Sequence, residues 1–218
     1  MGQGLVFDFD GLILDTESPL YEAWVVTYEH FGVEPISLPE WSLSLGRHDD
    51  DPLMLDPYAR LEEALGRRVD RAEVHGVRRG LGDQALDIAP LQPGVEALLD
   101  EAEALGLAVA IASSSPPEWI QRHLEPRGLL DRFPVLSCAG EGLPGKPHPA
   151  VYIEACRAIG ADPTRSLALE DSPNGAHAAK AAGMACVIVP TVVSRHLDLD
   201  HADLVVTSLE HLVLADWF

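Results

Sequence analysis

The chain has 218 residues, of which 47% are hydrophobic and 23% are charged, a composition typical of a soluble globular protein. Thirty-five acidic against fifteen basic side chains give a formal net charge of −20, which opposes binding to nucleic acids and to anionic membranes. The three cysteines are widely spaced, no apolar run approaches the roughly 20 residues of a membrane span, and the first residues include no basic leader, so we expect a cytoplasmic protein without disulfides.

The first predicted strand is followed at once by two carboxylates. Leu5, Val6 and Phe7 form a short apolar run, and Asp8, Asp10 and Gly11 come where that strand must end. Residues two apart in an extended chain point the same way, so Asp8 and Asp10 are expected on one side. Two such carboxylates call for a compensating cation such as Mg²⁺, or for one protonated acid. Because Asp-x-Asp-Gly is also a common turn sequence, this stretch alone leaves both readings open.

A helical insertion is predicted next. Ser18 and Pro19 are start signals for a helix whose apolar residues recur at helical spacing and which Gly32 ends. Further helices are predicted near 39–45, 52–65 and 71–88, with no convincing strand among them. Residues 89–94 have the composition of a linker.

Strands and helices alternate from Val95 onward. The pattern predicts strands at 107–112, 135–138, 166–169, 185–189 and 204–206, and helices at 95–105, 118–124, 150–159 and 175–182. This alternation indicates an α/β fold with a parallel sheet covered on both faces, and ligands are expected at the carboxyl ends of the strands.

Polar groups follow three more of these predicted segments. Ser113, Ser114 and Ser115 come after strand 107–112, where Ser115 and Glu118 are spaced as a capping box with Pro116 at the first helical position. Hydroxyls and backbone N–H groups at a helix start bind phosphate, although a serine-rich loop is often only a loop. Lys146 lies in a Gly-Lys-Pro turn and brings a cation to the same region, unless it is simply a solvated loop residue.

Glu170 and Asp171 form a second acidic pair, directly after strand 166–169. An acidic pair before a helix can complement the helix dipole, or it can complete a Mg²⁺ site. Four strand ends that carry acids, a hydroxyl, a lysine and two more acids are harder to attribute to chance than any one of them.

Taken in order, the segments Asp8-Phe9-Asp10-Gly11, Ser113 after an apolar strand, Gly145-Lys146-Pro147 and Glu170-Asp171 resemble the four motifs of the haloacid dehalogenase-like superfamily. With a helical insertion after the first motif, the chain is similar to the subgroup of β-phosphoglucomutases, phosphoglycolate phosphatases and sugar-phosphate phosphatases. The resemblance implies a Rossmann-like parallel-sheet core at 1–15 and 90–218, an inserted α-helical cap domain at 16–89, and phosphoryl transfer through an aspartyl-phosphate.

The same resemblance implies roles for individual residues. Asp8 matches the nucleophile and Asp10 the general acid/base. Phosphate binding falls to the hydroxyls and cation of Ser113, Ser114 and Lys146, and to the backbone N–H groups of Gly11 and Leu12. A Mg²⁺ ion is expected on Asp8, the main-chain carbonyl of Asp10, Asp171 and Glu170, the last directly or through water.

Several branches of the superfamily are disfavoured. Dehalogenases lack an acid at the position of Asp10, and phosphonatases use a cap lysine, whereas residues 16–88 contain no lysine. β-Phosphoglucomutases carry a histidine and an arginine where this chain has Leu20 and Asp49, and a carboxylate is wrong for holding a second phosphate.

We therefore expect a monomeric phosphatase that acts on a small phosphorylated metabolite, with Arg47, Arg78 and Arg79 as candidate substrate contacts. A phosphosugar mutase is the alternative, and a non-catalytic phosphate-binding protein is the minor one.

Overall fold

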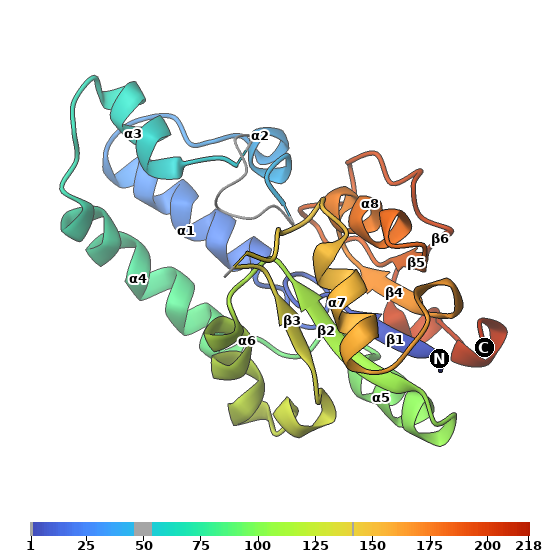
Figure 1. The fold of residues 1–218 in the computed structure, drawn as a ribbon. Coiled ribbons are helices and arrows are strands. Elements are labelled where there is room, and N and C mark those ends of the chain that lie inside the picture. Colours follow the sequence, from blue (N-terminus) through green and yellow to red (C-terminus); the bar gives the residue numbers. More distant parts are fainter. Residues whose placement is uncertain (1, 46–53, 141) are drawn as a thin grey trace.

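The computed structural model describes residues 2–45, 54–140 and 142–218. Its centre is a parallel sheet of six strands in the order β3-β2-β1-β4-β5-β6 (Figure 1). The strands are β1 (Gly4–Phe7), β2 (Ala108–Ser113), β3 (Leu136–Cys138), β4 (Leu167–Glu170), β5 (Ala185–Ile188) and β6 (Leu204–Val205). Each predicted strand is present with its ends shifted by at most one residue. The α/β, Rossmann-like fold class is thereby confirmed.

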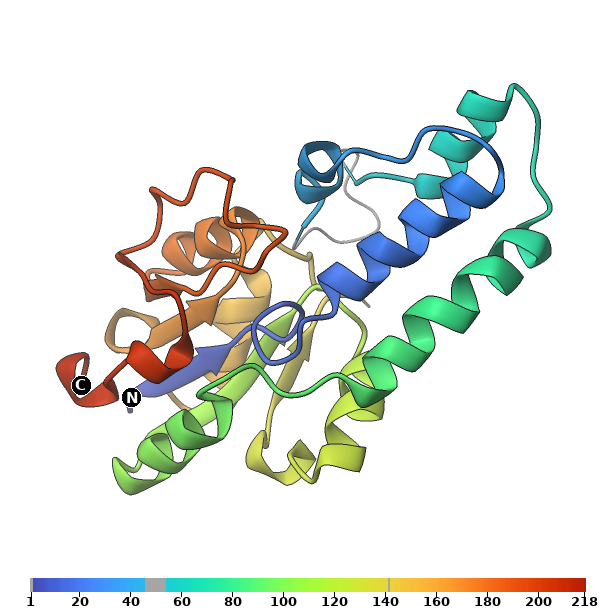
Figure 2. The same ribbon diagram turned by 180° about the vertical axis from the view of Figure 1, so that it is seen from behind.

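Helices cover both faces of the sheet. α5 (Val95–Ala104) and α6 (Pro117–Leu124) contribute to one apolar core, and α7 (Ala150–Ala158) and α8 (Pro173–Ala181) contribute to the other (Figures 1 and 2). In β1, Leu5 and Phe7 enter the first core and Val6 the second, all fully buried, as expected of a central strand covered on both sides. Short 3-10 turns complete the layers: η1 (Glu125–Arg127), η2 (Leu130–Arg132), η3 (Pro163–Arg165), η4 (Leu209–His211) and η5 (Leu214–Asp216).

In the described part of the inserted segment, 16–45 and 54–89, four helices share an apolar core of their own. They are α1 (Glu17–His30), α2 (Leu38–Ser42), α3 (Pro57–Leu65) and α4 (Arg71–Ile88). Trp24, Tyr28, Trp41, Leu61 and Val74 pack together there, and α1 lies alongside α4 (Figure 2). Two connections join these helices to the sheet side by side, because Leu14 bridges to Leu91 and the N–H of Gln92 donates to the carbonyl of Ile13 at 2.9 Å.

Several helix starts differ from the prediction, among them those of α1, α3 and α6. α1 begins at Glu17 rather than at Ser18, whose N–H donates to Asp15 Oδ1 at 3.0 Å. α3 begins at Pro57 behind the N-cap Asp56, and residues 52 and 53 of the predicted helix lie outside the described part. The capping box at Ser115 is wrong, since α6 starts at Pro117 with no side-chain cap. Within the described ranges, no helix is long and apolar enough to span a membrane.

Candidate functional site

The site lies where the strand order reverses. The chain runs outward from β1 through β2 and β3 to one edge, then from β4 through β5 and β6 to the other. In open parallel sheets, ligands bind at the carboxyl ends of the strands at such a reversal. A cleft of about 940 Å³ opens at this place. Its sheet side is lined by Asp8, Asp10, Ser113, Ser114, Ser115 and Lys146, so the predicted phosphate-site hydroxyls and cation meet the two aspartates there.

Asp8 is held in a buried ionic cluster. Its N–H donates to the carbonyl of Leu169 at 2.9 Å, which fixes the chain at the end of β1 against β4. The Lys146 ammonium donates to Asp8 Oδ1 and, at 2.6 Å, to Glu170 Oε1. The Tyr152 hydroxyl, which sequence reasoning did not single out, donates to the same Glu170 oxygen. Lys146 is therefore a buried partner of two carboxylates rather than a solvated loop residue.

The pKa values of Asp8 and Lys146 are both raised, for different reasons. Burial, reinforced by the negative charge of Glu170 and opposed by Lys146, raises the pKa of Asp8 to about 8. Burial by itself would lower the pKa of Lys146, but its two carboxylate partners raise it above the usual range. The ammonium thus stays charged, whereas burial favours the protonated form of Asp8.

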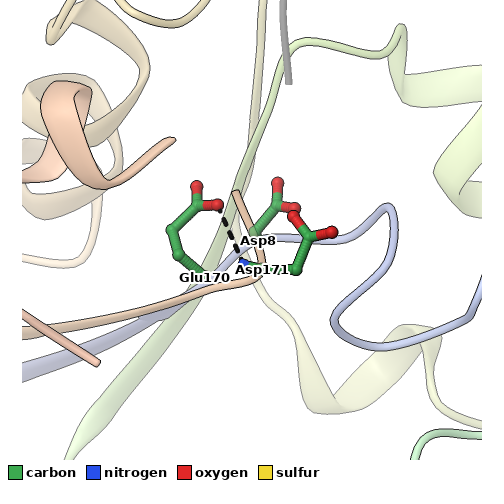
Figure 3. Close-up of side chains that lie close together, drawn as sticks. All are labelled: Asp8, Glu170 and Asp171. Carbon is green, nitrogen blue, oxygen red and sulfur yellow. Dashed lines mark hydrogen bonds between the residues drawn. The ribbon is translucent and has the colours of Figure 1, made fainter. Parts of the chain in front are cut away.

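The donor set fits a divalent cation. Asp8, Glu170 and Asp171 each offer a carboxylate oxygen within 4.8 Å of the others (Figure 3). Asp171 Oδ2 is buried without a hydrogen-bond partner, and burial together with the charge of Asp8 raises the pKa of Asp171 well above its usual value. When all three carboxylates are ionised, they exceed the single ammonium of Lys146 by two negative charges. Oxygen ligands with that excess suit a hard cation such as Mg²⁺.

Gly11 is required by the path of the loop after β1. Its φ is +84°, and a Cβ there would overlap Asp171 Oδ2, so only glycine lets the loop after β1 pass this carboxylate. Its N–H donates to the carbonyl of Leu14 at 2.7 Å, and binding of a phosphate by this N–H stays a prediction. The Leu12 side chain is buried in the core beside β1.

The Asp10 carboxylate has its own set of partners, separate from the cluster around Asp8. Oδ1 accepts from Thr16 Oγ1 and from Trp119 Nε1, both at 2.8 Å, and Oδ2 accepts from Ser115 Oγ at 2.6 Å. The rule that alternate residues of an extended chain point the same way does not apply to Asp8 and Asp10, because β1 ends at Phe7. Sequence reasoning missed Thr16 and Trp119 and assigned Ser115 to a helix cap.

The other two loop serines support the sheet side of the cleft. Ser113 is buried, and its Oγ accepts from the N–H of Ser115 at 3.0 Å, which leaves its hydroxyl hydrogen to be donated elsewhere. Ser114 Oγ accepts from the N–H of Lys146 at 3.1 Å and so ties the loop after β2 to the Gly-Lys-Pro turn.

The helical insertion forms the opposite wall. It contributes Glu17, Leu20 and Arg78 among other side chains. The Arg78 guanidinium lies 5.4 Å from the centroid of the Trp24 ring. Burial, followed by the charges of Asp10 and Asp8, raises the pKa of Glu17 to about 8. Arg79 is exposed and outside this lining, and Arg47 and Asp49 lie outside the described residues.

Comparison with known proteins agrees with this geometry. Residues 3–183 match the family model described as haloacid dehalogenase-like hydrolase. A Bacillus subtilis (strain 168) protein named "Putative phosphatase YhcW" is 39% identical over 216 residues, covering 99% of this chain and 96% of the relative. Hexitol phosphatase B of Escherichia coli (strain K12) is 34% identical over 187 residues, covering 85% of this chain and 82% of that protein.

A solved structure covers the whole fold. CbbY from Rhodobacter sphaeroides in complex with phosphate superposes with a TM-score of 0.76 at 25% identity, over 100% of this chain and 99% of that chain. The similarity therefore includes the helical insertion as well as the sheet.

Proposed function

The chain belongs to the haloacid dehalogenase-like hydrolase family and is a phosphohydrolase of the sugar-phosphate type, and on this premise we propose a Mg²⁺-dependent phosphatase that works through an aspartyl-phosphate on Asp8. The observation that carries the proposal is the buried cluster at the end of β1. There, Asp8 shares the Lys146 ammonium with Glu170 and lies beside Asp171. A carboxylate nucleophile of this kind splits hydrolysis into two displacements at phosphorus.

In the first displacement, an Asp8 carboxylate oxygen forms a bond to phosphorus while the bond from phosphorus to the ester oxygen breaks. The leaving oxygen takes the electron pair and receives a proton from the Asp10 carboxyl. In the second displacement, Asp10 takes a proton from water as the water oxygen bonds to phosphorus and releases Asp8. Asp10 therefore acts first as general acid and then as general base.

The remaining groups position the phosphate group and neutralise its negative charge. Lys146 offsets the negative charge beside Asp8, and Ser113 and Ser114 lie where their hydroxyls can reach a phosphate oxygen. Asp8, Asp171, Glu170 and the main-chain carbonyl of Asp10 would hold Mg²⁺, which supplies charge compensation for the phosphate and keeps the carboxylates ionised. Helices α1–α4 act as the cap domain over residues 16–89, which excludes water and selects the substrate.

Hydrolysis is favoured over phosphosugar mutation. The cleft wall offers the aliphatic Leu20 where a mutase would present a histidine, and two relatives carry phosphatase names. One of them is a hexitol phosphatase, so polyol and sugar phosphates head the substrate panel, followed by phosphoglycolate.

Mg²⁺-dependent hydrolysis of p-nitrophenyl phosphate tests the proposal. We expect turnover that is lost in EDTA, restored by Mg²⁺, and abolished in Asp8→Asn. Turnover that survives in Asp8→Asn would contradict the nucleophile assignment. Incubation with β-glucose 1-phosphate and a trace of the 1,6-bisphosphate separates the alternative, since rapid formation of glucose 6-phosphate with little free phosphate would identify a mutase.

A further inference from the structure

The Asp10 carboxylate is gripped by donors from three separate parts of the chain. Thr16 lies in the connection to α1, Ser115 in the loop after β2, and Trp119 in the first turn of α6. Two donors share Oδ1 and one serves Oδ2, with donor–acceptor distances of 2.6 to 2.8 Å. Such an arrangement fixes the rotation of the carboxylate as well as its place.

The indole of Trp119 is itself held in place. Its ring makes an edge contact with His123 at 4.4 Å between centroids, and His123 in turn stacks on Phe9 at 6.3 Å. Phe9 is fully buried and lies between Asp8 and Asp10 in the sequence. The donor is thus anchored through one intervening ring to the very loop that carries Asp10.

The chemistry of the donors makes the two oxygens of Asp10 unequal. An indole N–H can only donate, so Oδ1 must act as an acceptor towards Trp119 whatever the protonation state of the carboxyl group. A serine hydroxyl can either donate or accept, so Ser115 can face Oδ2 in both states. The proton of the acid form therefore belongs on Oδ2.

We propose that Trp119 and Ser115 are positioning residues for proton transfer by Asp10, a role that rests on the proposed function of Asp10 as general acid/base. Trp119 keeps Oδ1 as an acceptor and so assigns the proton to Oδ2. In the first displacement, the Oδ2 proton moves to the leaving ester oxygen, and the Ser115 hydroxyl then donates to the carboxylate. In the second, Oδ2 takes a proton from the attacking water, and the Ser115 hydroxyl turns to accept.

The test uses two phosphate esters of similar size whose leaving groups differ in their need for a proton. p-Nitrophenolate is a weak base that leaves without protonation, whereas the benzyl alkoxide released from benzyl phosphate is a strong base. kcat/KM reports the steps up to the first irreversible one, which here is transfer of the phosphoryl group to Asp8. General acid catalysis contributes about 10²- to 10⁴-fold, so a misplaced acid slows benzyl phosphate selectively.

We expect Trp119→Phe and Ser115→Ala each to lower kcat/KM for benzyl phosphate about 10-fold or more while changing it less than about 3-fold for p-nitrophenyl phosphate. Ser115→Thr, which keeps a hydroxyl, should restore most of the loss. Trp217→Phe controls for the loss of an indole elsewhere, because Trp217 packs on the core from the C-terminal end of the chain. Thermal denaturation of each variant establishes that it is folded.

Asp10→Asn separates failure of this inference from failure of the proposed function. If Asp10→Asn lowers both substrates equally, Asp10 is not the general acid and the proposed function is wrong at that residue. If Asp10→Asn is selective for benzyl phosphate but Trp119→Phe and Ser115→Ala are not, the positioning role is overturned. Equal losses on both substrates in the two positioning variants would likewise overturn it, since they would indicate a structural role only.

Discussion

Removal of the Asp8 carboxyl should change how the stability of the metal-free protein depends on pH. The pKa of Asp8 is raised from 3.8 to about 8 in the folded chain, chiefly by burial and next by Glu170. Between these values the unfolded chain has lost a proton that the folded chain still holds, so the free energy of unfolding falls as pH rises. Each pKa unit corresponds to about 1.4 kcal/mol, which gives a loss of about 5 kcal/mol between pH 4 and pH 8 as an order of magnitude.

Urea denaturation in EDTA at several pH values, for wild type and for Asp8→Asn, measures this loss. Asparagine cannot ionise, so wild type should become less stable relative to the variant as pH rises from 4 to 8. Saturating Mg²⁺ should remove most of the difference in slope, because a bound cation favours the ionised carboxylates. Parallel curves for the two proteins in EDTA, or a relative gain of wild type at pH 8, would refute the reasoning.

Three further predictions concern the packing at Gly175, the end of α4 and the binding of phosphate. Gly175→Ala places a Cβ on the Glu170 carboxylate, so it should lower the free energy of unfolding by about 2 kcal/mol or more and abolish p-nitrophenyl phosphatase activity. The control Gly76→Ala in α4 adds a Cβ that meets no atom within 4 Å and should raise the free energy of unfolding by about 0.5–1 kcal/mol. Comparable thermal shifts in the two variants would contradict this. The Arg127 guanidinium donates to the carbonyls of Leu86 and Ala89 at 3.0 and 2.7 Å. Arg127→Met should therefore lower the free energy of unfolding by about 1–3 kcal/mol and speed amide hydrogen exchange at the end of α4. Unchanged exchange at that helix end would disprove this effect. Inorganic phosphate should raise the melting temperature in Mg²⁺ but not in EDTA, and an equal rise in EDTA would show that the acidic cluster does not need the cation to accept an anion.

The sheet could be predicted from the sequence because its signals are local and periodic. Each predicted apolar run of three to six residues became a strand, and the strand ends placed Asp8, Ser113 and Glu170 at one edge without any knowledge of the strand order. Parallel strands need only share a direction for their carboxyl ends to meet. The placement of the site was therefore a consequence of fold class.

The surroundings of Asp10 could not be predicted in the same way. Ser115, three residues before Glu118, has the spacing of a capping box, and local rules favour that interpretation. In the folded chain the Ser115 hydroxyl instead meets Asp10, which is 105 residues away in sequence, and Trp119 meets it from 109 residues away. Proline at 116 and 117 starts α6 without a side-chain cap, which leaves the serine available. Hydrogen bonds between residues so far apart in the sequence produce no periodic pattern in the sequence.

The charge distribution of the site explains why Lys146 is both buried and fully occupied. In a chain with a net charge of −20, a phosphate group approaches against a repulsive field, and one ammonium shared by Asp8 and Glu170 cannot by itself reverse that field. Lys146 instead stabilises the buried acidic cluster, because burial of a carboxylate without a partner lowers the stability of the fold by several kcal/mol. Once all three carboxylates are ionised, two negative charges remain uncompensated, and a divalent cation would balance them. We therefore propose that the cluster binds a metal before it binds an anion, and that the hydroxyls of Ser113 and Ser114 supply hydrogen bonds to the phosphate without adding to the charge.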